Sequence, residues 1–490
     1  MSNCLRKTFY CGFIAVFSIL FFNVIFNNMH FDYKWYIVLP LATVWFALIY
    51  FYRCIVYKKQ LFLETNEIKL LVAFFVLLVV TQVFYFTQMA SYPTRDLENV
   101  FRSAYYYAIQ GAVDPLNTDY LYKHPNNLPW VISFQFIFRI ARKFGADTYL
   151  TYIIIATVVN AVAICMAYLF TYLLCRKTMG VSQGFVALGL LYSCLPLQFN
   201  ISFFYTDTLT MPFIPMVLLF YISYNKRPLK KSVLRIMLFA VATAYGIHLK
   251  YSVVIVVIAI VIDLILNLDI KRLVAFGGVL LMAFVLWQNI FNSFTYSNIL
   301  DKAQAKDAAT PFSSYIMMGL NGDGSFNVDD RYYAWSFETK EEKEENIRQQ
   351  IIYRLSQHTP LTFLQHLNQK GVRSFGSGNM EYNYTISNSP VKQTFLVECV
   401  SPGTEEFVWM GNIVQGWHLM LFLLVIFSAV VALKKSDFSL FVPILSVAGL
   451  YLFLLLWESS QRYLVNYMCM YILCAVYALN FIVNRNKGIK

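Results

Sequence analysis

The sequence predicts an all-α polytopic membrane protein with about twelve transmembrane helices. Its 490 residues are 58% apolar and only 13% charged, whereas a soluble domain carries about 25% charged residues. The apolar residues gather in runs close to the ~20 residues that one helix needs to cross a bilayer. The net charge of +12 comes from Lys and Arg in short loops between these runs, a placement typical of membrane orientation and not of nucleic-acid binding. Membrane lipid is therefore an expected partner and nucleic acid is not.

Twelve apolar segments are candidate spans. The first follows Arg6 and Lys7 and lacks a small-x-small cleavage site, so we expect an uncleaved helix rather than a signal peptide. The segments are 9–27, 36–53, 70–90, 148–174, 181–203, 208–224, 233–248, 251–267, 273–293, 415–433, 438–457 and 463–483.

The basic residues predict the orientation. With cytoplasmic N- and C-termini, 20 Lys and Arg fall in cytoplasmic segments, including 225–231, 434–435 and 484–490. The short loops on the other side hold three, which are Lys34, Lys250 and Arg462. This asymmetry favours a multi-pass protein of the cell membrane with both ends in the cytoplasm.

Two long loops then face outward, 91–147 and 294–412, and loops of this length are usually functional. In the first, 96–111 and 127–144 have the pattern of amphipathic helices that lie in the membrane interface. In the second, helical patterns cover 341–357 and 359–371. The predicted organisation is an N-terminal two-span extension (1–69), a membrane core (70–293), the large external loop (294–412) and C-terminal spans (413–490).

Charged residues at the predicted outer ends of spans are the best candidates for function, because a charge near hydrocarbon is costly. They all fall on the outer side of the predicted topology, although the acidic residues were not used to predict it. They are Asp96, Glu98, Asp207, Lys250, Glu458 and Arg462, and His124 joins them from the first loop.

Simpler roles compete with each of these assignments. Glu458 and Arg462 are four residues apart and would pair on one helix face, and His124 fits an ordinary turn. Asp329-Asp330 and the nearby Asn-Gly-Asp-Gly turn lack calcium-loop spacing. The nine cysteines form neither a zinc motif nor a disulfide framework. We therefore expect no metal site and no cofactor.

The order of short motifs resembles a known enzyme class. It runs TRDLENVFRSA, YKHPNN, FYTDTLTMP, HLKYSVVIVVIA, GLNGDGSFN, FLQHLNQKG and a late E-x-x-x-R-Y. Over about residues 70–485 the chain resembles bacterial GT-C glycosyltransferases, integral-membrane enzymes that use polyprenyl-phosphate sugars. It is similar to protein O-mannosyltransferases of glycosyltransferase family 39, to lipid A aminoarabinose transferases and most of all to Gram-positive members that decorate envelope polymers.

The resemblance implies a GT-C-like fold and a role for each candidate. Asp96 would be the general base, with Glu98 the second acidic residue of that site. Lys250 and Arg462 would hold the donor phosphate, and the substrates would contact His124, Asn126, Tyr205, Asp207 and Glu458. The chain departs from the family where O-mannosyltransferases have two adjacent acidic residues, since Leu97 separates Asp96 from Glu98. The two spans in 1–69 are a second departure.

The expected reaction transfers a sugar from a polyprenyl-phosphate donor to an extracytoplasmic acceptor such as an envelope polysaccharide, teichoic acid or glycolipid. Phosphate is a good leaving group that needs cations, and the acceptor hydroxyl needs one base, so direct displacement with inversion is predicted. No Gly-rich nucleotide fold or Walker loop is present to hold a nucleotide sugar. A transporter or flippase of lipid-linked sugars and a glycan polymerase or ligase with a diphosphate-linked donor are the alternatives.

Overall fold

The computed structural model describes residues 2–26, 33–224 and 233–485, and the regular secondary structure in these ranges is helical. The only β-type pairing among the described residues is an isolated bridge between Ser91 and Pro390. The all-α prediction is therefore confirmed. The predicted cytoplasmic segment 225–231 and residues 486–490 of the predicted tail lie outside the described residues.

Eight helices of the described chain are long and apolar enough to cross a membrane. A ninth span arises if α9 (Val181–Ser193) and α10 (Leu195–Phe199), bent by 67° against each other, count as one. The eight are α1 (Ser2–Phe26), α2 (Trp35–Lys58), α4 (Glu67–Met89), α8 (Tyr149–Met179), the α11–α12 stretch (Thr206–Thr210 and Phe213–Tyr224), α15 (Ile270–Asn298), α23 (Glu405–Lys435) and α25 (Tyr463–Arg485).

The prediction of twelve full spans is corrected to eight or nine. Each remaining predicted segment is a helix, but one of only 10–17 residues, which falls short of the ~20 residues of a straight crossing. These helices are α13 (Val233–Leu249), α14 (Val254–Leu266) and α24 (Phe441–Leu456). Lys250 lies in the break between α13 and α14, where the chain turns through the short helix η4 (Tyr251–Val253).

The core of the bundle lies around α23 and α25, the most deeply buried long helices together with α11–α12. Aromatic and aliphatic side chains of α1 and α2, among them Tyr10, Phe17 and Ile49, belong to the same buried cluster as Trp417 of α23. Helices α1 and α2 thus pack on α23, whereas the short helix α3 (Gln60–Thr65) packs on α9. The nine cysteines are all free.

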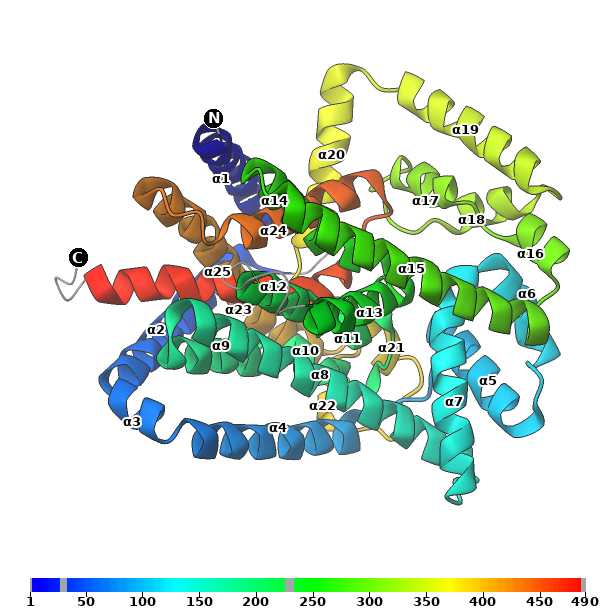
Figure 1. Ribbon diagram of the computed structural model, residues 1–490, viewed down its shortest axis with the longest axis horizontal. Coiled ribbons are helices and arrows are strands. Elements are labelled where there is room, and N and C mark those ends of the chain that lie inside the picture. The colour runs from blue at the N-terminus through cyan, green and yellow to red at the C-terminus, as the bar shows by residue number, and fades with distance from the viewer. Residues whose placement is uncertain (1, 27–32, 225–232, 486–490) are drawn as a thin grey trace.

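The first long loop folds into three helices, α5 (Arg95–Gln110), α6 (Pro115–Lys123) and α7 (Leu128–Lys143), with the turn η1 (Pro125–Asn127) before α7. The two predicted amphipathic helices are thereby confirmed as helices. Their apolar faces meet around Phe101, Trp130 and Phe138. In Figure 1, α7 runs across the direction of α4, as expected of a helix beside the ends of spans.

The large loop lies between the end of α15 and the start of α23, and it also folds into helices. Both predicted helical stretches are confirmed, as α19 (Lys340–Ser356) and α20 (Pro360–Phe375). A capping box of Thr339 and Glu342 starts α19, and Pro360 occupies the first turn of α20. The remaining helices are α16 (Lys302–Ala308), α17 (Phe312–Gly319), α18 (Val328–Trp335), α21 (Asn383–Ile386) and α22 (Phe395–Glu398).

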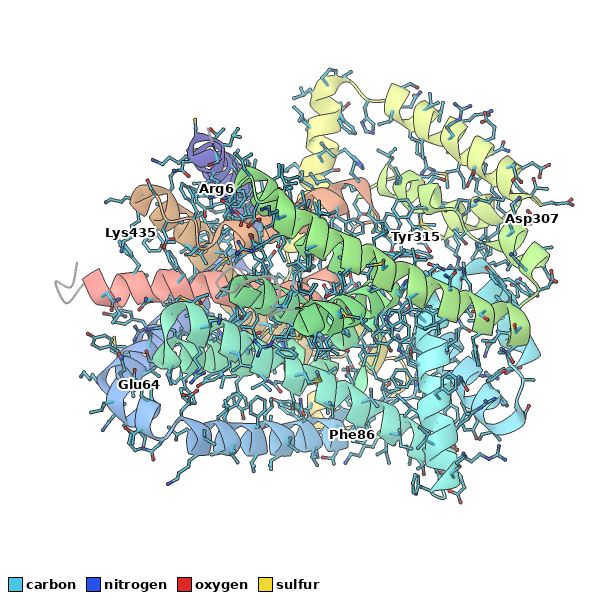
Figure 2. The ribbon with its side chains drawn as sticks, in the orientation of Figure 1. Arg6, Glu64, Phe86, Asp307, Tyr315 and Lys435 are labelled. Carbon is cyan, nitrogen blue, oxygen red and sulfur yellow. The ribbon has the colours of Figure 1, made fainter. Side chains whose placement is uncertain are left out.

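The molecule has two distinct ends along the direction of its long helices. Figure 1 shows the start of α1 and the end of α25 at one end, with α5–α7 and α16–α19 at the other. Figure 2 places Arg6 and Lys435 at the first end and Asp307 at the second. Arg6 and Lys435, which are predicted to be cytoplasmic, thus lie far from Asp307, which is predicted to be external.

Candidate functional site

Asp96 lies in the first turn of α5, at the edge of the first long loop. Its carboxylate accepts a hydrogen bond from the Tyr120 hydroxyl. Arg95, directly before it, has φ +57°, a left-handed conformation that is costly for a residue with a side chain. The surrounding fold therefore holds Asp96 in place against local backbone strain.

A hydrogen-bond chain runs from Asp96 into the protein. The Tyr120 hydroxyl accepts from Nδ2 of Asn127 at 2.7 Å, and Oδ1 of Asn127 accepts from the Tyr205 hydroxyl at 3.0 Å. Burial, followed by the charge of Asp96, raises the pKa of both tyrosines. Both phenols thus stay neutral and act as hydrogen-bond donors, which fixes the position of the carboxylate.

His124 lies next to this chain. Its ring centroid is 4.7 Å from that of Tyr120, and burial lowers the pKa of His124 while Asp96 opposes that shift. The predicted contact residue Asn126 is exposed and donates only to its neighbour Asn127, at 3.5 Å. The turn therefore contributes Asn127 and not Asn126 to the group around Asp96.

Glu98, the second predicted acidic residue, has a different environment. Its Oε1 accepts from Arg102 one helical turn later at 3.5 Å, and Arg102 also pairs with Asp114 at 2.9 Å. The Glu98 side chain is 44% exposed. Because Asp96 and Glu98 are two residues apart on α5, their side chains lie on different faces of the helix. Glu98 therefore belongs to the ion-pair group with Arg102 and Asp114.

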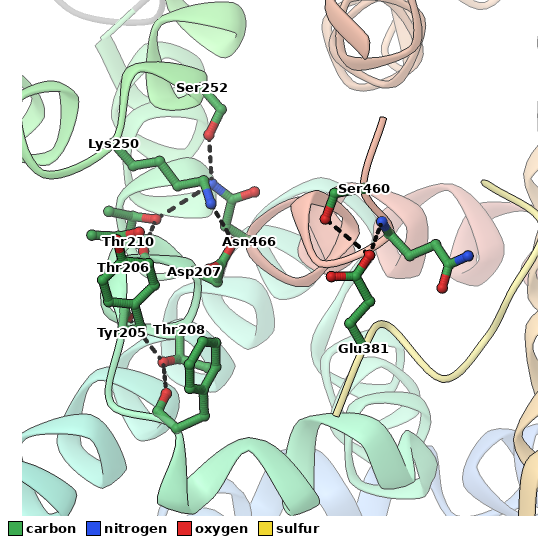
Figure 3. Close-up of polar contacts among 12 residues, drawn as sticks. Tyr205, Thr206, Asp207, Thr208, Thr210, Lys250, Ser252, Glu381, Ser460 and Asn466 are labelled. Carbon is green, nitrogen blue, oxygen red and sulfur yellow. Dashed lines mark hydrogen bonds and ion pairs between the residues drawn. The ribbon is translucent and has the colours of Figure 1, made fainter. Parts of the chain in front are cut away.

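Lys250 and Asp207 form a buried ion pair (Figure 3). The Lys250 amine also lies 4.2 Å from the centre of the Tyr463 ring, and burial lowers the pKa of this amine. Only one Asp207 oxygen is used, because Oδ2 is buried without a hydrogen-bond partner. Lys250, predicted as a phosphate ligand, thus already has a carboxylate beside it.

Glu458 and Arg462 lie in the connection between α24 and α25. Residues 458–460 are not helical, so the pairing expected from helical spacing does not form, and no ion pair within 4 Å joins these two described residues. Burial raises the pKa of Glu458 to about 6. This carboxyl group therefore changes charge close to neutral pH.

The Arg462 guanidinium has no hydrogen bond or ion pair within the described part of the chain, and its Nε is buried without a partner. Although burial opposes it, the charge of Asp207 raises the pKa of Arg462 above its usual value. A permanently charged fork without an acceptor is costly to bury, so this group is the clearest unsatisfied binding element of the site.

The large loop contributes residues that sequence reasoning missed. Oε1 of Glu381 accepts a hydrogen bond from the Ser460 hydroxyl at 3.0 Å and one from the backbone N–H of Gln461 at 3.1 Å (Figure 3). The backbone of Glu381 is left-handed, with φ +59°. The Tyr315 ring of α17 stacks on Trp457 at 4.6 Å. No motif marks these residues in the sequence, because only the packing of the large loop on the α24–α25 connection brings them there.

Electrostatic interactions define which predicted residues share one site. Besides burial, the charge of Asp96 raises the pKa of Tyr205 and that of Glu458. The charge of Arg462 lowers the pKa of Tyr205 and that of Lys250. The site thus unites Asp96, His124, Tyr205, Asp207, Lys250, Glu458 and Arg462, joined by Tyr120, Asn127 and Glu381. Among the described residues, no three His, Cys, Asp or Glu side chains are grouped closely enough to hold a metal ion.

Two cavities lie near the membrane helices. One of 210 Å³ has an almost wholly apolar lining from α7, α8, α11–α12 and α13, including Leu209 and Leu249, which are close in sequence to Asp207 and Lys250. The other, of 720 Å³, is lined by residues such as Arg176 and Arg235 and contains none of the predicted site residues. Of the two cavities, the apolar one is therefore lined by close sequence neighbours of Asp207 and Lys250.

Comparison with known proteins gives one match. The model of a family described as "conserved hypothetical integral membrane protein" matches residues 1–482. No curated protein and no solved structure matches the chain.

Proposed function

We propose, for a chain that belongs to the family of conserved hypothetical integral membrane proteins, that it transfers a sugar from a polyprenyl-phosphate donor to an acceptor outside the cytoplasm. The observation that carries the proposal is the Arg462 guanidinium, which lacks an acceptor within the described chain and shares a half-buried group with Asp96 and Lys250. This combination offers a cation for a leaving phosphate and a base for a hydroxyl. The resemblance of the motif order to GT-C glycosyltransferases supports the same reaction.

The donor phosphate would bind Arg462. A guanidinium recognises phosphate through two parallel hydrogen bonds, and Nε and the outer nitrogens of Arg462 are free for this contact. Lys250 would add charge, since an ammonium group has three donors and Asp207 accepts from it at one oxygen. Asp207 would keep Lys250 oriented between turnovers.

The reaction would be a direct displacement. The acceptor oxygen attacks the anomeric carbon, the bond from that carbon to the phosphate oxygen breaks, and polyprenyl phosphate leaves with the electron pair. Asp96 takes the hydroxyl proton as the new bond forms, and Tyr120 holds the carboxylate. Arg462 and Lys250 stabilise the charge that develops on the leaving phosphate, and attack from the opposite face inverts the anomeric configuration.

The first isoprene units of the lipid tail would lie in the apolar cavity of 210 Å³, and the rest of the tail would lie in the bilayer. The lining residues Leu209 and Leu249 connect the cavity to the two helix ends that carry Asp207 and Lys250. A polyprenyl chain held there has its phosphate at the depth of these charges. The cavity would thereby bring the scissile bond to Arg462.

The test is transfer by the purified protein in proteoliposomes, given a labelled polyprenyl-phosphate sugar and an envelope acceptor. The proposal predicts covalent attachment of the sugar to the acceptor and release of polyprenyl phosphate. Movement of the intact donor across the bilayer without transfer would contradict it and favour a flippase. Transfer from only a diphosphate-linked donor would favour a glycan polymerase or ligase.

A further inference from the structure

A second group of cations lies where the first loop meets the large loop. Arg331 of α18 is stacked among aromatic rings, with its Cζ 4.9 Å from the centre of the Trp335 ring and 5.2 Å from that of Phe326. Lys123 of α6 places its Nζ 4.4 Å from the centre of the same Trp335 ring. The Trp335 indole donates to Thr310 at 2.9 Å. Two cations from different loops thus share one fixed aromatic side chain.

The donors of Arg331 are not used by the protein. Aromatic stacking engages the face of a guanidinium and leaves its N–H groups at the edge, and Nε of Arg331 is buried without a partner. The neighbouring Asp330 is engaged by Arg354, at 2.8 and 2.5 Å, and by Asn321 at 3.2 Å. No ion pair within the described chain includes Arg331.

The two cations of the cluster differ in their partners. Lys123 pairs at 2.7 Å with Asp119, whose side chain is 73% exposed, and such exposed pairs contribute little. Burial lowers the pKa of His124, Arg331 and Lys123 lower it further, and Asp96 and Asp119 oppose that shift. Arg331 is thus the cation of this cluster that has no carboxylate partner within the described chain.

The cluster adjoins the proposed base. The His124 ring lies 5.8 Å from Trp335 on one side and 4.7 Å from Tyr120 on the other, measured between ring centroids. Tyr120 in turn donates to Asp96. An acceptor whose hydroxyl reaches Asp96 would place its neighbouring unit against Arg331 and Lys123. Tyr332 and Phe326, 58% and 51% exposed, border the cluster on its open side.

We propose that Arg331 and Lys123 form an acceptor subsite that binds an anionic group, a phosphodiester or a carboxylate, on the glycan that receives the sugar. This inference rests on the proposed function and adds the chemical class of the acceptor to it. The stacked guanidinium gives the paired donors that planar oxygen anions require, and Lys123 adds a point charge. A neutral glycan would leave Arg331 without an anionic partner.

The test is binding of soluble probes to the full-length protein in detergent, measured by calorimetry. The probes are a short poly(glycerol phosphate), a uronic-acid oligosaccharide and a neutral oligosaccharide of equal length. We expect binding of one or both anionic probes and none of the neutral one, and the comparison of the two anions separates phosphate from carboxylate recognition. Equal binding of the neutral probe would overturn the inference.

Variants sharpen this test. Arg331→Gln should weaken anionic binding roughly tenfold to a hundredfold, the effect of one charge-assisted hydrogen bond, with Arg331→Lys in between. The matched control is Arg348→Gln in α19, whose side chain is 66% exposed and paired with Glu345, and it should bind as wild type. Wild-type binding by an Arg331→Gln protein with an unchanged melting temperature would also overturn the inference.

Failure of the subsite and failure of the proposed function give different experimental results. Binding of anionic probes without any transfer from a polyprenyl-phosphate donor would contradict the proposed reaction and leave the subsite standing. Transfer to acceptors that is insensitive to Arg331→Gln would contradict only the subsite.

Discussion

The Nζ of Lys370 donates a hydrogen bond to the backbone carbonyl oxygen of Trp457 at 2.8 Å, and a second to Gly319 at 2.7 Å. Lys370 belongs to α20 of the large loop, whereas Trp457 directly precedes Glu458 in the α24–α25 connection. The Lys370 side chain is almost completely buried, and burial lowers its pKa to about 8. One amine therefore ties the large loop to the segment that carries Glu458 and Arg462.

This tie predicts that Gly324→Ala is more harmful than Gly322→Ala. Both glycines have positive φ, but a Cβ at Gly324 would lie 2.8 Å from the Lys370 stem, whereas one at Gly322 meets nothing within 4 Å. Overpacking costs about 1–3 kcal/mol, so Gly324→Ala should lower both the melting temperature and transfer more than its neighbour does. Equal effects of the two variants would show that Lys370 does not hold the segment.

Asp96→Asn should lower the rate of transfer by roughly 10²–10⁴ because a positioned base is lost, while donor binding stays near wild type. The matched control is Glu98→Gln on the same helix, which removes only the contact with Arg102 and should retain most activity. Turnover and donor binding are measured on purified proteins. A fully active Asp96→Asn enzyme would remove Asp96 from the mechanism.

Arg462→Ala should weaken donor binding or the transition state by about 1.5–3 kcal/mol, the contribution of a charge-assisted hydrogen bond. Arg462→Lys should restore only part, because the bidentate fork is lost. Lys392→Ala, which removes an exposed cation of the large loop, is the control for net charge. Reduced thermal stability with unchanged donor affinity would instead identify a structural role for Arg462.

Stability should depend on pH through Glu458. Its pKa is raised from 4.5 to about 6 in the folded protein, so its contribution is fully present below pH 4.5 and is lost as pH rises through 6. The loss is about 2 kcal/mol at 1.36 kcal/mol per pH unit. Glu458→Gln should flatten this part of the melting-temperature profile between these pH values. An identical profile in both proteins would contradict the burial of an ionisable Glu458.

The orientation is tested with tags. A tag at 340 should be accessible from outside the cell, and tags within 226–231 and 434–437 should be accessible only from the cytoplasm. Protease or maleimide labelling of intact cells and of inverted vesicles provides the measurement. Position 340 on the cytoplasmic side would overturn the assignment of the site together with the topology.

Much of the fold follows from composition and periodicity, since every predicted apolar segment is a helix. The number of full crossings did not follow, because the short predicted segments 233–248 and 251–267 were counted as full spans. Hydropathy also does not reveal that α14 and α24 are shorter than predicted or that the helix breaks at Cys194. Lys250 marks a second break, between α13 and α14.

The sequence indicated those site residues that are charged in regions where charges are rare. It did not indicate the residues that only tertiary packing brings to the site. Asp96, Asp207, Lys250 and Arg462 stood out as charges at the ends of spans. Asn126 was predicted as a substrate contact, whereas the amide in the hydrogen-bond chain belongs to Asn127, since a one-residue step around the turn leads from that chain to solvent. Glu381 lies in a polar loop where an acidic residue is ordinary, and its left-handed backbone has no sequence signal.

The central claim is that this protein adds a sugar to an envelope glycan with Asp96 as the base. Mass analysis of envelope polymers from cells that carry the wild-type protein, the Asp96→Asn variant or no copy tests it most directly. We expect that one glycosyl mass increment present with the wild type is missing in both other strains, although the Asp96→Asn protein is made and inserted. Identical polymer masses in all three strains, or a normal polymer with Asp96→Asn, would contradict it.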